Sequence, residues 1–204
     1  GRFANTEGVM KDDYRHRYSL GFKLDYHVNN SILVSNRTTY TEIKAQNTPY
    51  GSFAEYVTMN PYERMYNEDG TPNTDLAWDL DNPLYEASLG SYSRNGTNTF
   101  ANSTDIRWDI TNQFRLTGHF NITSQTGWKD IFRSPKSRDF KDITDLTKKG
   151  SSTQTDSRSV SYNANVVATF NHIFKDESLI SANAGWEINH SEATSKTLQA
   201  VGFF

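Results

Sequence analysis

Residues Tyr18–Val28 read YSLGFKLDYHV, an unbroken alternation of apolar and polar positions. The apolar positions are all even-numbered: Tyr18, Leu20, Phe22, Leu24, Tyr26 and Val28. The odd positions between them carry small, charged or polar residues. Because successive side chains of a β-strand point to opposite faces, this pattern predicts a long strand with one apolar and one polar face.

The same alternation recurs along the chain. It occupies residues 32–40, 104–110, 114–128, 160–170 and 179–188. Asn36 interrupts the apolar set of the first of these segments. Together with Tyr18–Val28 the segments predict six strands in three hairpins, and every apolar set again falls on even numbers. The fold class is therefore all-β and antiparallel.

The shared parity constrains the turns within the hairpins. When two facing residues are both even-numbered, an odd number of residues separates them. A two-residue turn would move the second apolar set to the wrong face. We therefore expect turns of three or five residues at Asn29–Ser31, at Thr111–Gln113 and near Lys175–Glu177.

The connections between the hairpins are long, at about residues 43–103 and 129–158. Compact soluble domains seldom contain structureless loops beyond about 12–15 residues. Membrane β-barrels do alternate short turns with long extracellular loops, and strands of about 9–11 residues suffice to cross the bilayer. This favours part of a transmembrane β-barrel. The alternative is a soluble β-sandwich, such as a carbohydrate-binding module, which shows the same alternation.

Two further features of the strands favour the barrel. The polar faces carry mixed charge, as a polar lumen would: Lys23, Asp25, Arg37, Asp105, Arg107, Asp109 and Arg115. Large aromatic residues lie near strand ends, where the interfacial girdles of a barrel lie: Tyr18, Tyr40, Phe114, Trp128, Phe170 and Trp186.

Composition excludes several classes of function. The 204 residues have a formal net charge of -3, which gives no reason to expect nucleic acid as a partner. The chain contains no cysteine, so disulfides and thiolate metal sites are excluded. No apolar run approaches the ~20 residues of a membrane helix. The chain begins at Gly1 without a methionine, which we interpret as a processed or excised piece.

The titratable residues do not predict a metal or catalytic site. Asp75, Asp79, Asp81 and Glu86 supply oxygen ligands that suit calcium, but their spacing does not match an EF-hand, and a solvated acidic loop is favoured. The histidines are scattered without ligand spacing, at positions 16, 27, 119, 172 and 190. No nucleophile motif is present. We therefore expect no enzyme activity, no metal and no cofactor.

The first long connection is rich in aromatic residues and turn signals. It contains NPYERMYNEDG, Asn60–Gly70, in which Pro61 and the Asp69–Gly70 step exclude a continuous helix. Its candidate contact residues for a substrate or a partner protein are Tyr62, Arg64, Tyr66, Trp78 and Tyr85. The alternative is that the aromatic residues form a small core of the loop itself. Both interpretations stay open.

Several segments also resemble a known family. NPYERMYNEDG followed by NPLYEASL resembles an extracellular loop of SusC/RagA-type TonB-dependent outer-membrane transporters of Bacteroidetes. YRHRYSLGFKLDYHV, TNQFRLTGHFNITSQTGW and FNHIFKDESLISANAGWEI resemble the strands of the family's barrel. The two Asn-Pro segments, at Asn60 and Asn82, are the most specific part of the resemblance.

The resemblance implies what the chain does and where it lies. It implies import of a nutrient, such as an oligosaccharide or a peptide, across the outer membrane, with a SusD-like surface lipoprotein as partner. TonB would act through a plug region that this sequence does not contain. The family's barrels have about 22 strands, so residues 1–204 would be a partial barrel. Residues 45–102 would form an extracellular lobe and residues 129–158 a second extracellular loop.

Overall fold

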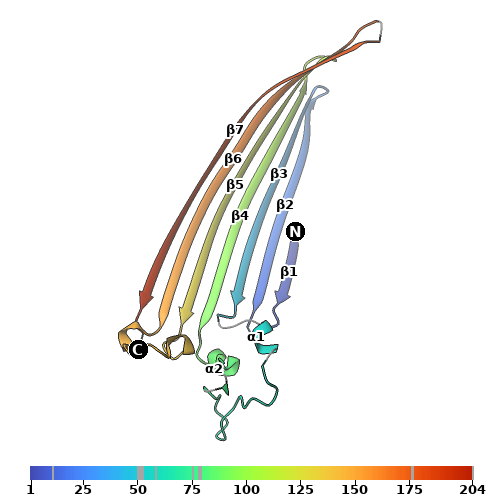
Figure 1. Ribbon diagram of the computed structural model, residues 1–204. Helices are drawn as coiled ribbons and strands as arrows, with labels where there is room; N and C mark the ends of the chain where they lie inside the picture. The colour runs from blue at the N-terminus through green and yellow to red at the C-terminus, as the bar shows by residue number, and fades with distance from the viewer. Residues whose placement is uncertain are drawn as a thin grey trace.

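The computed structural model describes residues 1–10, 12–49, 53–57, 59–74, 76–77, 80–175 and 177–203. Its strands form one antiparallel sheet of seven strands in the order β1 to β7, so each strand pairs with its neighbours in sequence (Figure 1). The strands are β1 (Arg2–Glu7), β2 (Tyr14–Asn29), β3 (Ile32–Asn47), β4 (Tyr92–Asp109), β5 (Phe114–Arg133), β6 (Ser151–Ile173) and β7 (Leu179–Val201). Among the described residues between β3 and β4 lie two short helices, α1 (Phe53–Val57) and α2 (Pro83–Ser88).

The all-β, antiparallel prediction is confirmed, and the sheet holds one strand more than the six expected. The additional strand is β1, which pairs along the outer side of β2 from Arg2↔Ser19 to Glu7↔Tyr14. Its six residues, RFANTE, contain too few apolar side chains to alternate, so periodicity could not reveal it. Backbone pairing with β2 supplies its hydrogen bonds.

The register confirms the shared parity of the apolar faces. Directly opposite residues lie on the same face of a sheet. Across one row, Leu20 faces Tyr40, Tyr40 faces Phe100, and Phe100 faces Ser124. Even-numbered residues therefore share one face from β2 to β7, which we call the even face. Residues on the other side form the odd face.

Two of the three tight turns confirm the predicted odd spacing. In the β4–β5 turn the N–H of Ile110 donates to the carbonyl of Phe114 across residues 111–113. In the β6–β7 turn the N–H of Phe174 donates to the carbonyl of Ser178. The prediction of a three- or five-residue turn at Asn29–Ser31 is wrong, because the closing pair of the β2–β3 hairpin is Asn29↔Ile32, which leaves a two-residue turn. A bulge lies between His27 and Asn29 on β2. The extra residue of the bulge restores the parity.

The connections between hairpins are shorter than the predicted 43–103 and 129–158. Strand β3 continues to Asn47 and β4 begins at Tyr92, so the first connection spans residues 48–91. The second spans residues 134–150 and contains two short 3-10 helices, Arg138–Phe140 and Leu146–Lys148. The strands continue where both faces have become polar, as in the serine- and threonine-rich start of β6, so hydrophobic alternation underestimates their length.

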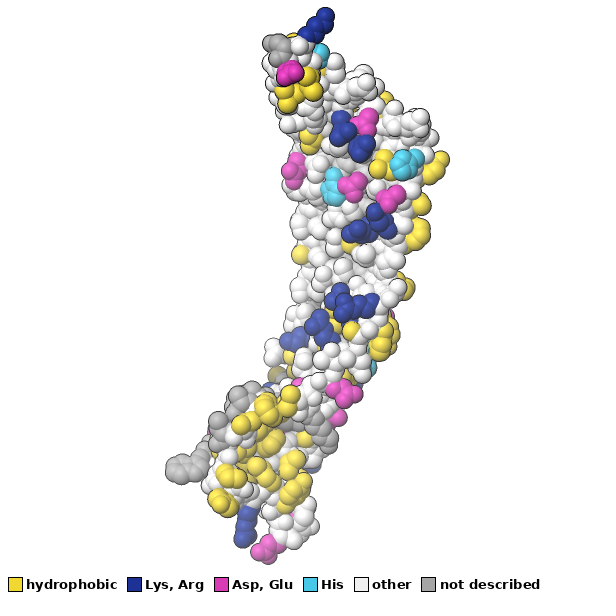
Figure 2. Space-filling model, turned by 90° about the vertical axis from the view of Figure 1, so that its right-hand side faces the viewer, with side chains coloured by type: hydrophobic (Ala, Val, Ile, Leu, Met, Phe, Trp, Pro, Cys, Tyr) yellow, Lys and Arg dark blue, Asp and Glu magenta, His cyan; other side chains and the backbone are white. Residues whose placement is uncertain are grey.

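The sheet has no hydrophobic core of its own within the described residues. Only Ala45 and Leu76 are buried apolar residues there, whereas Leu20 is 65% and Phe22 63% exposed. Figure 2 shows hydrophobic side chains along one margin of the strand region, beside a face that carries charge. A sandwich would cover this surface with a second sheet, so the single sheet contradicts that alternative. No helix in the described part of the chain is long and apolar enough to cross a membrane.

Candidate functional site: a polar sheet face and a two-loop lobe

The odd face carries a network of charged side chains near the tight turns. Asp109 Oδ2 forms an ion pair with Arg107 Nη2 at 2.9 Å, and Asp109 Oδ1 forms one with Arg115 Nε at 2.5 Å. On β2, Lys23 Nζ lies 2.8 Å from Asp25 Oδ2. The predicted mixed charge of this face is thus organised as short pairs between neighbouring positions. All these side chains are partly exposed, so the pairs orient charge toward solvent and add little stability.

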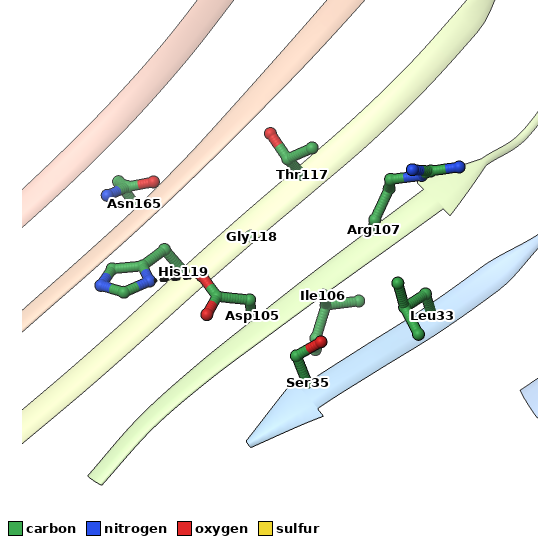
Figure 3. A pocket seen from close by; sticks show the side chains of 9 residues that line it. All are labelled: Leu33, Ser35, Asp105, Ile106, Arg107, Thr117, Gly118, His119 and Asn165. Carbon is green, nitrogen blue, oxygen red and sulfur yellow. Dashed lines mark hydrogen bonds and ion pairs between the residues drawn. The ribbon is translucent and has the colours of Figure 1, made fainter. Parts of the chain in front are cut away.

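A shallow hollow of about 270 Å³ lies on this sheet between β3 and β6 (Figure 3). His119 Nδ1 lies 2.6 Å from Asp105 Oδ1 at its centre, and Ser35 and Asn165 line its sides. His27 and His119 are odd-numbered, so the alternation of the strands predicts both on the polar face, and the register confirms that. Sequence analysis missed the Asp105 partner of His119, because only the register brings these two residues opposite each other.

The odd face offers hydroxyl, amide and charged groups to a hydrophilic neighbour. Its middle rows hold small side chains such as Ser19, Thr41 and Thr99, which lie opposite one another on β2, β3 and β4. Such hydrogen-bonding and charged groups can bind a hydrophilic ligand without covalent chemistry.

The connection at residues 48–91 is organised around Asn82. This side chain is fully buried, and its amide donates to the carbonyls of Met65 at 2.8 Å and Asn73 at 2.7 Å. Its Oδ1 accepts from the N–H of Leu84 at 2.9 Å, so Asn82 also caps α2. Pro83 occupies the first turn of that helix, where a missing N–H costs nothing. One side chain therefore ties three segments together.

Glu86 joins the two connections into one lobe. It is 1% exposed, and its carboxylate accepts from Ser137 Oγ at 2.8 Å and from the N–H of Arg138 at 2.9 Å. The Arg138 guanidinium reaches back to Asp81 Oδ1 at 2.9 Å and to the carbonyl of Thr74. A buried carboxylate is stable only when hydrogen bonds replace its water, and these donors supply them.

The predicted contact residues lie in different parts of this lobe. Tyr62 is 90% exposed, and Tyr66 forms an isolated β-bridge with Pro72. The backbone carbonyl of Arg64 accepts from Asn73 Nδ2 at 3.2 Å. Tyr85 lies at the junction of the two connections, where its hydroxyl donates to the carbonyl of Lys136 at 3.0 Å. Trp78 falls outside the described residues.

The acidic residues considered as calcium ligands serve other contacts where they are described. Glu86 accepts from Ser137 and Arg138, and Asp81 pairs with Arg138. Asp75 and Asp79 lie outside the described residues. In the described part of the chain, no three His, Asp or Glu side chains come together as metal ligands.

The sequence placed Asn82 in the predicted lobe, but its central contacts, and the part that Ser137 and Arg138 play in joining the two connections, were not predicted. For Asn82 a signal was present, because Asn followed by Pro is typical of an N-cap and the first position of a helix. For Ser137 and Arg138 there was none, because their partner Glu86 is about fifty residues away in sequence.

Tyr85 and Asp145 are among the titratable groups of the lobe whose pKa values are shifted. Burial, and then the charge of neighbouring Glu86, raises the pKa of the Tyr85 hydroxyl above its usual value of 10.0. Tyr85 therefore stays protonated and keeps its donor role at neutral pH. Hydrogen bonds from the Thr147 hydroxyl and N–H lower the pKa of Asp145 below its usual 3.8, so this cap stays ionised at neutral pH.

The exposed apolar face, the polar opposite face and the up-and-down order define an antiparallel segment of a β-barrel. Solved structures share this fold. The chain matches a structure of the RagAB peptide importer in the closed-closed state with a TM-score of 0.76 and 16% identity, over 98% of this chain and 23% of that one. A structure of the RagAB peptide transporter matches with a TM-score of 0.76 and 15% identity, over the same shares.

These likenesses establish the fold, an antiparallel segment of a β-barrel that is shared with part of the RagAB chains. The chain spans about a quarter of the length of the transporter chain that it matches. No protein-family model and no curated protein matches it.

Proposed function

We propose that the chain is part of the barrel of an outer-membrane transporter, with its even face toward lipid and its odd face toward the lumen. The observation that carries the proposal is the exposed apolar zone on the even face. Leu20, Phe22 and Leu24 are each more than half exposed. An exposed apolar surface of this extent marks contact with another apolar phase.

The outline of the apolar zone supports a tilted barrel wall. The row of paired residues that begins with Leu20 on β2 passes through Val160 on β6. Val160 faces Glu192 of β7, so the apolar zone ends before this row reaches β7. On β2 the zone continues one step further, to Tyr18, which faces Glu42 of β3. An apolar zone oblique to the hydrogen-bonded rows is what a bilayer imposes on strands tilted by about 35–45°.

The lengths of the strands support the assignment of the two ends. Strands β6 and β7 have 23 residues each, far beyond the ~9–11 that cross a bilayer. Their apolar parts lie beside the tight turns, and their polar parts lead to the lobe. In barrels of this kind the short turns are periplasmic and the long loops extracellular. The residues of the lobe would accordingly lie outside the cell.

The likeness to the RagAB peptide importer supports transport as the activity and peptides as the first substrate class to test, with oligosaccharides second. A SusD-like lipoprotein covering the lobe, and TonB acting through a plug, complete the proposal. Exposed Tyr62 is the first candidate for contact with the lipoprotein. Binding and passage require no covalent step, so the proposed role is not enzymatic.

Single cysteines test the orientation, because the chain contains none of its own. We propose Glu68→Cys in the lobe and Asn112→Cys in the β4–β5 turn, labelled in cells with a membrane-impermeant maleimide. Position 68 should react in intact cells, and position 112 only after the outer membrane is permeabilised. Equal labelling of both positions in intact cells would refute the orientation. Growth of a strain lacking the protein on peptides and on oligosaccharides then identifies the substrate class.

A further inference from the structure

A cavity of about 390 Å³ opens at the junction of the two connections with the end of β7. Four segments build its wall: α2, the residues after β5, the second 3-10 helix with its flank, and the residues after β7. The lining residues are Tyr85, Pro135, Lys136, Leu146, Lys149 and Phe203.

Hydrogen bonds hold these walls in place. Tyr85 Oη donates to the carbonyl of Lys136 at 3.0 Å, and the N–H of Phe203 donates to the carbonyl of Lys149 at 2.9 Å. Gly202, directly before Phe203, has a positive φ of 85°. A Cβ at this position would lie 2.3 Å from the carbonyl oxygen of Thr147. The backbone therefore approaches so closely that only glycine fits. The cavity is a formed feature of the lobe.

The chemistry of the lining is apolar and cationic. Lys136 and Lys149 contribute ammonium groups, and the lining contains no carboxylate. Neither ammonium group forms an ion pair with a carboxylate among the described residues. Pro135, Leu146 and the ring of Phe203 form the remainder with Tyr85. Such a lining complements an anion attached to an apolar body.

A carbohydrate would fit this cavity poorly. Sugar hydroxyls need several hydrogen-bonding side chains, and the Tyr85 hydroxyl already donates to Lys136. The two lysines provide donors only. The terminal carboxylate of a peptide is complementary in charge to the two ammonium groups. The apolar side chain of the same terminal residue can pack against the apolar part of the wall.

We propose that this cavity binds the carboxyl-terminal residue of a peptide with an apolar last side chain. The carboxylate lies near Lys136 and Lys149, and the side chain contacts Leu146 and Phe203. This inference rests on the proposed role in peptide import and adds the part of the peptide that the lobe recognises.

The test compares two probes, N-acetyl-alanyl-phenylalanine as the free acid and as the amide. Binding is measured by calorimetry on the complete transporter in detergent. The free acid should bind about tenfold more tightly than the amide, because hydrogen bonds to charged groups are the stronger ones. The double variant K136Q/K149Q should lose that preference. The matched control is K148Q, an exposed lysine beside Asp145 that does not line the cavity.

The outcomes separate this inference from the proposed function. Equal affinity for acid and amide, or a preference that survives in K136Q/K149Q, overturns the cavity assignment while peptide import stands. Absence of binding for both probes, together with normal growth of the deletion strain on peptides, overturns both. A control variant that loses the preference as fully as the double variant would also refute the assignment.

Discussion

At the scale of single residues, the even face contains a polar cluster in the middle of its apolar zone. The cluster consists of Asn36 and Thr38 on β3 and Asn102 and Thr104 on β4. Each asparagine amide donates to the other asparagine and to a threonine on the opposite strand, at 2.8–3.2 Å. Each threonine hydroxyl donates to the asparagine of its own strand, at 3.2–3.3 Å. Every polar group of the cluster therefore has a partner.

Such a closed cluster can face lipid because it leaves no polar group unsatisfied. We predict that Asn36→Leu alone destabilises the barrel by about 1–3 kcal/mol, because it removes partners of Asn102 and Thr104. The double variant N36L/N102L should cost clearly less than the sum of the two single variants. Thermal unfolding of the complete transporter in detergent measures this. Additive costs would show that the four side chains act independently.

Asn82 provides the second prediction at this scale. Asn82→Asp keeps the acceptor that caps α2 but replaces the two donors that face Met65 and Asn73. We expect the lobe to open, so that limited proteolysis on intact cells cuts residues 59–74 faster, while the unfolding of the sheet is unchanged. The control is Asn60→Asp, in the other Asn-Pro step, whose exposed side chain has a single hydrogen bond among the described residues, as acceptor from the N–H of Tyr62. Equal protection of both variants would contradict this role of Asn82.

At the scale of elements, β5 shows how one strand serves two environments. Phe120 lies on the even face and Asn121 on the odd face. We predict that Phe120→Arg prevents assembly of the barrel, because arginine near the middle of the bilayer costs about 2–4 kcal/mol. Asn121→Arg should be mild, because a lumen accepts charge. Heat-modifiability of the barrel on gels measures assembly, and similar defects in both variants would refute the assignment of the faces.

At the scale of the whole molecule, the sheet is open at β1 and β7. Each of these strands pairs on one side only among the described residues. A barrel removes such edges by closure, and unpaired edges associate with other chains. We therefore predict that the isolated 204-residue chain aggregates or forms edge-to-edge assemblies in the absence of detergent. Size-exclusion chromatography with light scattering tests this, and a stable monomer without detergent would contradict it.

The sequence by itself determined the faces of the sheet and the length of two of its three tight turns. Alternation from Tyr18 to Val28 fixes which side chains share a face, because the period of a strand is two. Shared parity then fixes the odd turns of β4–β5 and β6–β7, whereas the β2–β3 hairpin keeps the parity with a two-residue turn and a bulge. These features are local, so a few neighbouring residues suffice to specify them.

Only the tertiary structure decided where the strands end, how β1 pairs and how the lobe is held together. Strand β4 extends back to Tyr92 because β3 and β5 satisfy its backbone, and such pairing continues where hydrophobic contrast has disappeared. The contact of Glu86 with Ser137 joins residues far apart in sequence. Hydrophobic periodicity cannot predict such a contact. The contact depends on the register, which places the first residues of β4 beside the last residues of β5.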